Sequence, residues 1–142
     1  MKKLLLSAIL AGSLVAVSAP AFAHHSFAAE YDASKPITLH GKLAKLSWVN
    51  PHGWIYVDVE NPDKSVTSWA VEFGSPNALL RRGLRETDFP LGIELTVNGY
   101  LAKNGKKIIN GTSVTLPDGR SLFTGSVGTG APGDPGEAQA NQ

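Results

Sequence analysis

The sequence predicts a small all-β domain with one short helix. Apolar and polar residues alternate with the two-residue period of strands in five stretches, at about residues 37–48, 53–60, 65–73, 93–101 and 107–116. Between the third and fourth stretches, Ser75 and Pro76 are typical of a helix start, and Gly83 of a helix end. This order is that of the oligonucleotide/oligosaccharide-binding (OB) fold, so we expect a small five-stranded OB-like barrel. Another small barrel, or a sandwich with one helix, has the same periodicity and is the alternative.

Local signals refine this prediction. The apolar phase shifts within the first strand, which predicts a bulge or sharp bend near residues 41–45. In the third strand Trp69 alternates with two other apolar residues, so we expect it in the core. Asn104 and Gly105 predict a hairpin, because both tolerate positive φ. A short extra strand is expected at residues 121–124.

The two ends of the chain differ from its middle. Residues 1–23 contain two lysines, an apolar run and a small-x-small ending, which predict a secretory signal peptide. A membrane anchor is the weaker interpretation, because the apolar run is shorter than the ~20 residues of a span. Residues 24–36 are expected to form an N-terminal arm on an OB-like domain, residues 37–124. Residues 125–142 are rich in Gly and Pro, and we expect them to be disordered.

The composition of the mature chain limits its partners and its compartment. Cleavage after residue 23 leaves 11 basic and 12 acidic residues, a formal net charge of −1. Such a charge gives no bulk attraction to nucleic acid. The sequence has no cysteine, which excludes disulfides and thiolate metal sites. Because no second hydrophobic segment follows the predicted signal peptide, we expect a periplasmic protein without a membrane span after signal cleavage, with full secretion as the other possibility.

Five short motifs stand out along the mature chain. They are His-His-Ser-Phe-Ala-Ala-Glu-Tyr-Asp at 24–32, Trp-Val-Asn-Pro-His at 48–52 with Gly41 before it, Trp-Ala-Val-Glu at 69–72, Ser-Pro-Asn-Ala-Leu at 75–79 and Leu-Pro-Asp-Gly-Arg at 116–120. As a set, they resemble a family of small exported proteobacterial proteins of unknown function. The resemblance implies an exported β-rich domain, and it brings no activity, cofactor or catalytic residue.

Histidines at the mature N-terminus suggest a metal site. If cleavage follows Ala23, His24 carries a free α-amino group and an imidazole, which together chelate one ion through two nitrogens. Such nitrogen ligands suit Cu(II), which heads the affinity order of divalent ions. In this hypothesis His25, or His52 from the loop after the first strand, completes the site. In the alternative, the histidine pair is flexible and His52 only caps its turn, while His40 is a solvated surface residue.

An aromatic surface is a second candidate site. Trp54 and Tyr56 alternate outward on the second strand, next to Trp48 and Asn50 in the preceding loop. OB folds commonly bind ligands on this face. The rings would stack on a sugar, a peptide or a base, or pack instead under the N-terminal arm.

Catalytic chemistry finds little support in the sequence. No nucleophile elbow, phosphate-binding loop or His-Glu-x-x-His motif occurs. Asp58, Glu60 and Glu72 are expected to be solvated on the outer face of the sheet. Two functions remain, a non-enzymatic exported module that binds copper through His24, and a structural or interaction domain that uses its aromatic face to bind an envelope protein or a saccharide.

Overall fold

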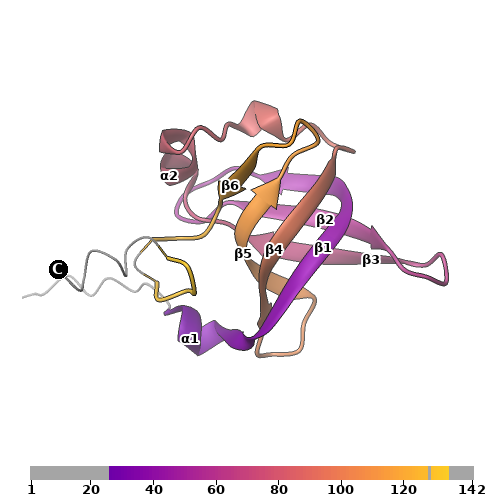
Figure 1. Ribbon diagram of the computed structural model, residues 1–142, viewed down its shortest axis with the longest axis horizontal. Coiled ribbons are helices and arrows are strands. Elements are labelled where there is room, and N and C mark those ends of the chain that lie inside the picture. Colours follow the sequence, from indigo (N-terminus) through magenta and orange to yellow (C-terminus); the bar gives the residue numbers. More distant parts are fainter. Residues whose placement is uncertain (1–25, 128, 135–142) are drawn as a thin grey trace, which may run out of the picture.

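The computed structural model describes residues 26–127 and 129–134. Within these ranges the chain forms a mostly antiparallel sheet of six strands (Figure 1). The strands are β1 (Tyr31–Ser47), β2 (Trp54–Glu60), β3 (Val66–Glu72), β4 (Glu94–Ala102), β5 (Ile108–Thr115) and β6 (Ser121–Phe123). Short helical segments are α1 (Phe27–Glu30), α2 (Pro76–Arg81) and the 3₁₀ turn η1 (Glu86–Asp88). None of these described helices has the length and apolarity to cross a membrane.

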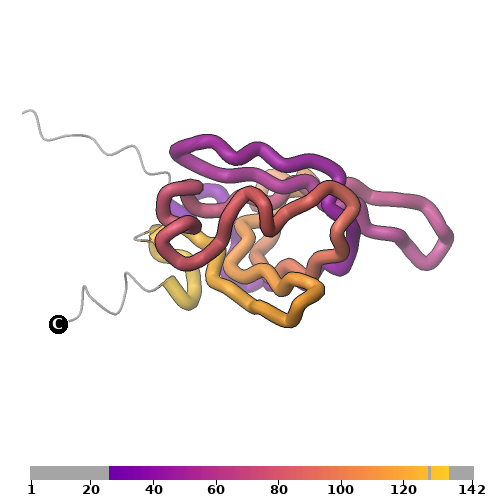
Figure 2. The backbone as a smooth tube through the Cα atoms, turned by 90° about the horizontal axis from the view of Figure 1, so that it is seen from above, coloured from indigo at the N-terminus to yellow at the C-terminus, as the bar shows by residue number. Residues whose placement is uncertain are grey.

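Five of the strands form a ring. The order in the sheet is β3-β2-β1-β4-β5-β6, and a parallel pairing of β3 with β5 joins its two sides. Figure 2 shows the same strands from above, with the β2–β3 hairpin extending to one side. Because α2 lies between β3 and β4 in the sequence, the arrangement is OB-like. The predicted β-β-β-α-β-β order and fold class are confirmed.

The long strand β1 serves two neighbours. Its first part pairs with β4 and its last part with β2, and the β2 register shifts between Leu43 and Lys45, where the bulge was predicted. Gly41 lies at the crossing. A Cβ atom built there would lie 2.3 Å from the backbone oxygen of Asp58, so the close approach of β1 and β2 requires glycine.

Helix α2 begins and ends as its signals predict. The Ser75 hydroxyl accepts a hydrogen bond from the Ala78 N–H at 3.3 Å, and Pro76 is the first helical residue. Gly83 follows the helix with φ of 89°, a conformation that favours glycine. Two further helical segments, α1 and η1, were not predicted.

The core fills the inside of the ring with apolar side chains from all five strands. Ile55, Val57, Val71 and Val97 are fully buried there. Trp69 packs against this core but stays half-buried, and Lys107 Nζ lies 5.0 Å from its ring centroid. The predicted inward face of β3 is therefore right, whereas the full burial of Trp69 is wrong.

Both ends of the domain differ from the prediction. Strand β1 begins at Tyr31, so residues 31–36 continue a strand instead of forming an arm. Residues 125–127 and 129–134 belong to the described structure, with Ala131 fully buried and Asp134 only 4% exposed. The expectation of disorder is wrong for this part of the tail, because its small residues fit against α1. Residues 135–142 lie outside the described ranges.

Candidate functional site

A carboxylate at the end of β3 joins two residues that are far apart in the sequence. The Tyr31 hydroxyl donates a hydrogen bond to Oε2 of Glu72. The other oxygen, Oε1, lies 3.1 Å from Nδ1 of His52. Only 13% of the Glu72 side chain and 33% of the His52 side chain are exposed. We call these three residues the His–Glu–Tyr cluster.

Backbone contacts hold the His52 loop against β3. Trp54, at the start of β2, pairs with Glu72 in the strand register. One step earlier, the carbonyl oxygen of Gly53 accepts a hydrogen bond from the Phe73 N–H at 2.7 Å. This contact extends the β2–β3 pairing beyond the strand itself. His52 therefore has a defined place beside the carboxylate.

Tyr31 is buried beneath α1. Its ring stacks on Phe27 with 5.7 Å between centroids, and Phe27 meets Tyr100 edge-on at 5.4 Å. Burial, followed by the hydrogen bond to Glu72 and the negative charge of that carboxylate, raises the pKa of the Tyr31 phenol far above its ordinary value. The phenol keeps its proton at neutral pH, so it can donate to Glu72 there.

The His52 ring has one nitrogen turned to the protein. Its Nδ1 is buried and makes no hydrogen bond of good geometry with the described residues. At 3.1 Å from Glu72 Oε1, however, it lies within ion-pair distance, and charge attraction depends on distance more than on angle. Since Nδ1 faces the carboxylate, Nε2 is the nitrogen left for a ligand.

A second apolar cluster lies outside the ring of strands, around the Tyr31 side chain. Phe27, Tyr31 and Ala131 are its buried members, and Tyr100 and Ile108 pack against them. Next to it on β5, Asn110 pairs with Glu72 in the strand register. Asn110 is buried, and its Oδ1 has no hydrogen-bond partner among residues 26–127 and 129–134. The polar side chains of the cluster are thus followed by a further polar side chain, Asn110, on the neighbouring strand β5.

The predicted aromatic residues do not share one role. Trp48 lies against a phenylalanine of the core, with 5.8 Å between ring centroids. Tyr56 is half-buried, and Lys45 Nζ lies 5.0 Å from its ring centroid. Asn50 is exposed in the loop. Of the four, Trp54 is the one that lines a groove beside the His–Glu–Tyr cluster.

This groove has a volume of about 540 Å³, within the range of small-molecule sites. It lies between α1, β2 and the β4–β5 hairpin. Lys103 on its edge donates to the backbone oxygen of Ala28 at 2.6 Å. The lining residues are Ala29, Glu30, Tyr31, Trp54, Ala102, Lys103, Asn104 and Ile108. Because Tyr31 belongs to both, the groove and the cluster are adjacent.

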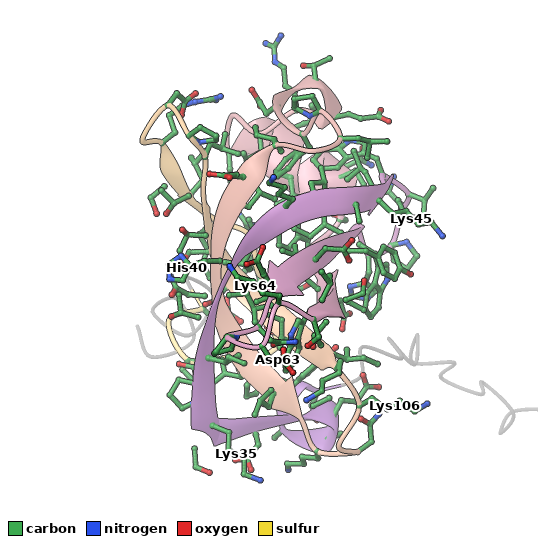
Figure 3. The ribbon with its side chains drawn as sticks, turned by 90° about the vertical axis from the view of Figure 1, so that its right-hand side faces the viewer. Lys35, His40, Lys45, Asp63, Lys64 and Lys106 are labelled. Carbon is green, nitrogen blue, oxygen red and sulfur yellow. The ribbon has the colours of Figure 1, made fainter. Side chains whose placement is uncertain are left out.

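The four histidines are not gathered in the described structure. His24 and His25 lie outside the described residues. His40 lies on the outer side of β1, where its Nδ1 is 2.9 Å from Thr96 Oγ1 (Figure 3). In the part of the chain that the structure describes, no three His, Asp or Glu residues are arranged to hold a metal ion.

Two members of the cluster were not predicted as site residues. Glu72 was expected to be a solvated carboxylate, and Tyr31 to belong to the N-terminal arm. A carboxylate that directly precedes a turn at the end of a strand was the one local signal, and it does not identify a partner 41 residues away. Their proximity depends on the parallel and antiparallel pairings that close the ring.

Fold and cluster together define a small OB-like β domain with a His–Glu–Tyr cluster next to its N-terminal helix. The chain belongs to a family of unknown function (DUF6152), whose model matches residues 11–112. The searches of curated proteins and of solved structures found no match. This match confirms that the chain belongs to a family of unknown function, as the motifs predicted. Strand β6 lies beyond the matched residues.

Proposed function

We propose that this protein is an exported, non-enzymatic binding module that binds Cu(II) through His24 at the mature N-terminus, with His52 as a further ligand. The His–Glu–Tyr cluster is the observation that supports this most directly. A metal-binding imidazole almost always has its second nitrogen beside a carboxylate, a carbonyl or a water. His52 has that environment already.

The carboxylate prepares His52 for a metal ion in two ways. Its negative charge favours a proton on Nδ1, so Nε2 carries the free lone pair that a metal needs. It also helps to fix the orientation of the ring, as such partners of metal-binding histidines do. The buried Tyr31 hydroxyl fixes the orientation of the carboxylate. A histidine that merely caps a turn needs neither partner.

His24 is close in sequence to Tyr31, one member of this cluster. It precedes Phe27 by three residues, and each residue spans at most about 3.8 Å, roughly 11 Å in all. Phe27 stacks on Tyr31, which in turn contacts Glu72. The short tether is consistent with a shared site for the His24 amine, its ring and the His52 ring. His25 is the alternative third ligand.

Three neutral nitrogen ligands and no sulfur favour Cu(II) among the divalent first-row ions. Protons compete for the same nitrogens, so metal affinity should fall as the pH decreases below neutrality. Tetragonal coordination would give a characteristic EPR spectrum. These properties make copper the first ion to test.

The experiment compares the mature chain beginning at His24 with a chain that has one added alanine before His24. The addition keeps all four imidazoles but moves the free amine away from the His24 ring. We expect a large loss of Cu(II) affinity, measured by competition with a chelator, and a changed EPR spectrum. His52→Ala should also weaken binding, whereas His40→Ala, on the outer side of β1, should not. Equal binding by the extended and the authentic N-terminus would reject the proposal.

The groove beside Trp54 favours a second function, an interaction domain for an envelope protein or a saccharide. Trp54 is half-buried and supplies an aromatic wall to the groove. Titration with chitotriose, followed by NMR chemical shifts, tests the saccharide form of this proposal. Shifts at groove residues that disappear in Trp54→Ala would support it. An unchanged spectrum of the parent protein would exclude this sugar as a ligand.

A further inference from the structure

Strand β3 has an open edge along its first half. The whole strand pairs with β2 on one side, but on the other side β5 pairs only with residues 70–72. The Ala70 N–H donates to the Lys107 oxygen at 2.9 Å on that second side, and the backbone groups of successive strand residues point to opposite edges. The N–H and C=O groups of Val66 and Ser68 therefore point to the same edge as those of Ala70. No strand of the described chain pairs with them there.

This edge is accessible and lacks the usual protection. Val66 is 61% exposed, and Ser68 is exposed as well. Sheets commonly protect an open edge with a proline, a charged side chain or a bulge. Residues 65–71 contain no proline and no charge, and the β2–β3 register has no shift. Because the β2–β3 hairpin extends beyond the ring, as Figure 2 shows, a partner strand has access to this edge.

The two ends of the open edge carry opposite charge. At the hairpin tip, Glu60 and Asp63 are negative and Lys64 is positive, which gives a net charge of −1. Figure 3 looks onto this tip, with Asp63 and Lys64 labelled. Lys64 forms an ion pair with Glu60 at 2.7 Å, so Asp63 supplies the remaining negative charge. At the other end of the edge, Lys106 and Lys107 are exposed positive charges.

We propose that the open edge of β3 is a homodimer interface, at which a second copy of this chain adds its own β3 in antiparallel orientation. A two-fold axis at Thr67 places Val66 opposite Ser68 of the second copy, and each such pair exchanges both of its backbone hydrogen bonds. The axis also places the acidic hairpin tip of each copy beside Lys107 of the other, where opposite charges attract. A second copy is the partner that fits, because its β3 has the same length, the matching backbone groups and the opposite charge. This interface does not depend on the copper site.

Analytical ultracentrifugation of the mature chain, residues 24–142, tests the dimer. We expect a monomer–dimer equilibrium that depends on concentration, with slower hydrogen exchange at the Ser68 amide in the dimer. Ser68→Pro removes one donor from the edge of each copy, and because this N–H points away from β2, the β2–β3 pairing is kept. The dissociation constant of the dimer should rise roughly tenfold or more, since two hydrogen bonds are lost per dimer. A parent protein that is monomeric at every concentration overturns the inference.

Two variants of exposed apolar residues keep the test valid if Ser68→Pro does not fold. Val66→Lys puts a charge on the open edge, whereas Leu91→Lys changes a residue that is 69% exposed in the turn before β4. We expect only Val66→Lys to weaken the dimer. A dimer that Val66→Lys leaves unchanged, or that both variants weaken equally, forms through another surface and overturns the inference.

A charge reversal tests the antiparallel arrangement. Asp63→Lys makes the hairpin tip positive and should weaken the dimer, because the tip then lies beside Lys107 of the other copy. Adding Lys107→Glu to the same chain should restore part of the lost affinity. Equal dissociation constants for Asp63→Lys and the parent protein, or a double variant no tighter than Asp63→Lys, overturn the arrangement.

Discussion

Replacement of Glu72 by glutamine tests the His–Glu–Tyr cluster with little change of shape. The Tyr31 hydroxyl can still donate to the amide oxygen, so the side chain should keep its orientation. The amide NH₂ group then faces His52, where the carboxylate oxygen is 3.1 Å from Nδ1. Nδ1 must accept from this donor, so the ring proton moves to Nε2. The nitrogen that we propose as the copper ligand is then protonated.

The expected effect is a 10- to 100-fold loss of Cu(II) affinity, the usual cost of losing a partner that orients a metal ligand. This corresponds to about 1.4 to 2.8 kcal/mol of binding free energy. The assay is a competition titration at pH 7 with a chelator of known affinity, on mature chains that begin at His24. Thermal unfolding of the copper-free chain shows whether Glu72→Gln is folded.

Glu60→Gln is the matched control for this variant. Glu60 is an exposed carboxylate at the end of β2, and its Oε1 forms an ion pair with Lys64 Nζ at 2.7 Å. Its replacement therefore removes one negative charge without changing the His–Glu–Tyr cluster. We expect its copper affinity to equal that of the parent protein. The reasoning is refuted if Glu72→Gln binds copper within about twofold of the parent, or if both variants lose the same affinity.

Three further predictions concern stability. The pKa of Tyr31 is raised on folding above its unfolded value of about 10, so its contribution to the free energy of unfolding is complete below that pH and is lost as the pH rises further. Chemical denaturation from pH 7 to 11 should therefore show a smaller loss of stability at alkaline pH in Tyr31→Phe than in the parent protein, and equal losses would contradict this prediction. Trp69→Ala should lower the free energy of unfolding by about 2 kcal/mol, roughly half the range for a fully buried tryptophan, and a value above about 4 would mean full burial. Gly41→Ala should lower the free energy of unfolding in urea by about 3 kcal/mol or more, because its Cβ would lie 2.3 Å from a backbone oxygen. Gly53→Ala, whose Cβ would lie 3.4 Å from its nearest atom, should lower it much less, and similar losses in the two variants would argue against the close approach at Gly41.

The strand order was predictable because its signals are local. Alternation over seven or more residues identifies β1 to β5, and a serine cap followed by proline identifies α2. The bulge after Leu43 appears in the sequence as a change of apolar phase. Trp69 was misjudged because alternation shows which face a residue occupies, but not whether that face ends at the rim of the core.

The candidate site was predictable only in part, because its contacts join distant segments. A histidine in a turn after a strand singled out His52, which lies beside Glu72 in the structure, whereas the predicted ligand His24 lies outside the described residues. Nothing in the sequence brings Tyr31 and Glu72 together, since β1 and β3 meet here through the β1–β4, β4–β5 and β3–β5 pairings. Glutamate on an outer strand face is usually solvated, but here the Tyr31 hydroxyl and the His52 ring lie against the carboxylate.

Composition also failed at residues 129–134, for a related reason. A stretch rich in glycine and proline lacks large apolar side chains, and such a stretch alone cannot offset the entropy of ordering. This segment is ordered by Phe27, whose ring supplies the apolar surface, and by Asp134, whose carboxylate accepts a hydrogen bond from the Thr129 N–H. Small residues are then an advantage, because Ala131 fits where a larger side chain would push α1 away from Tyr31.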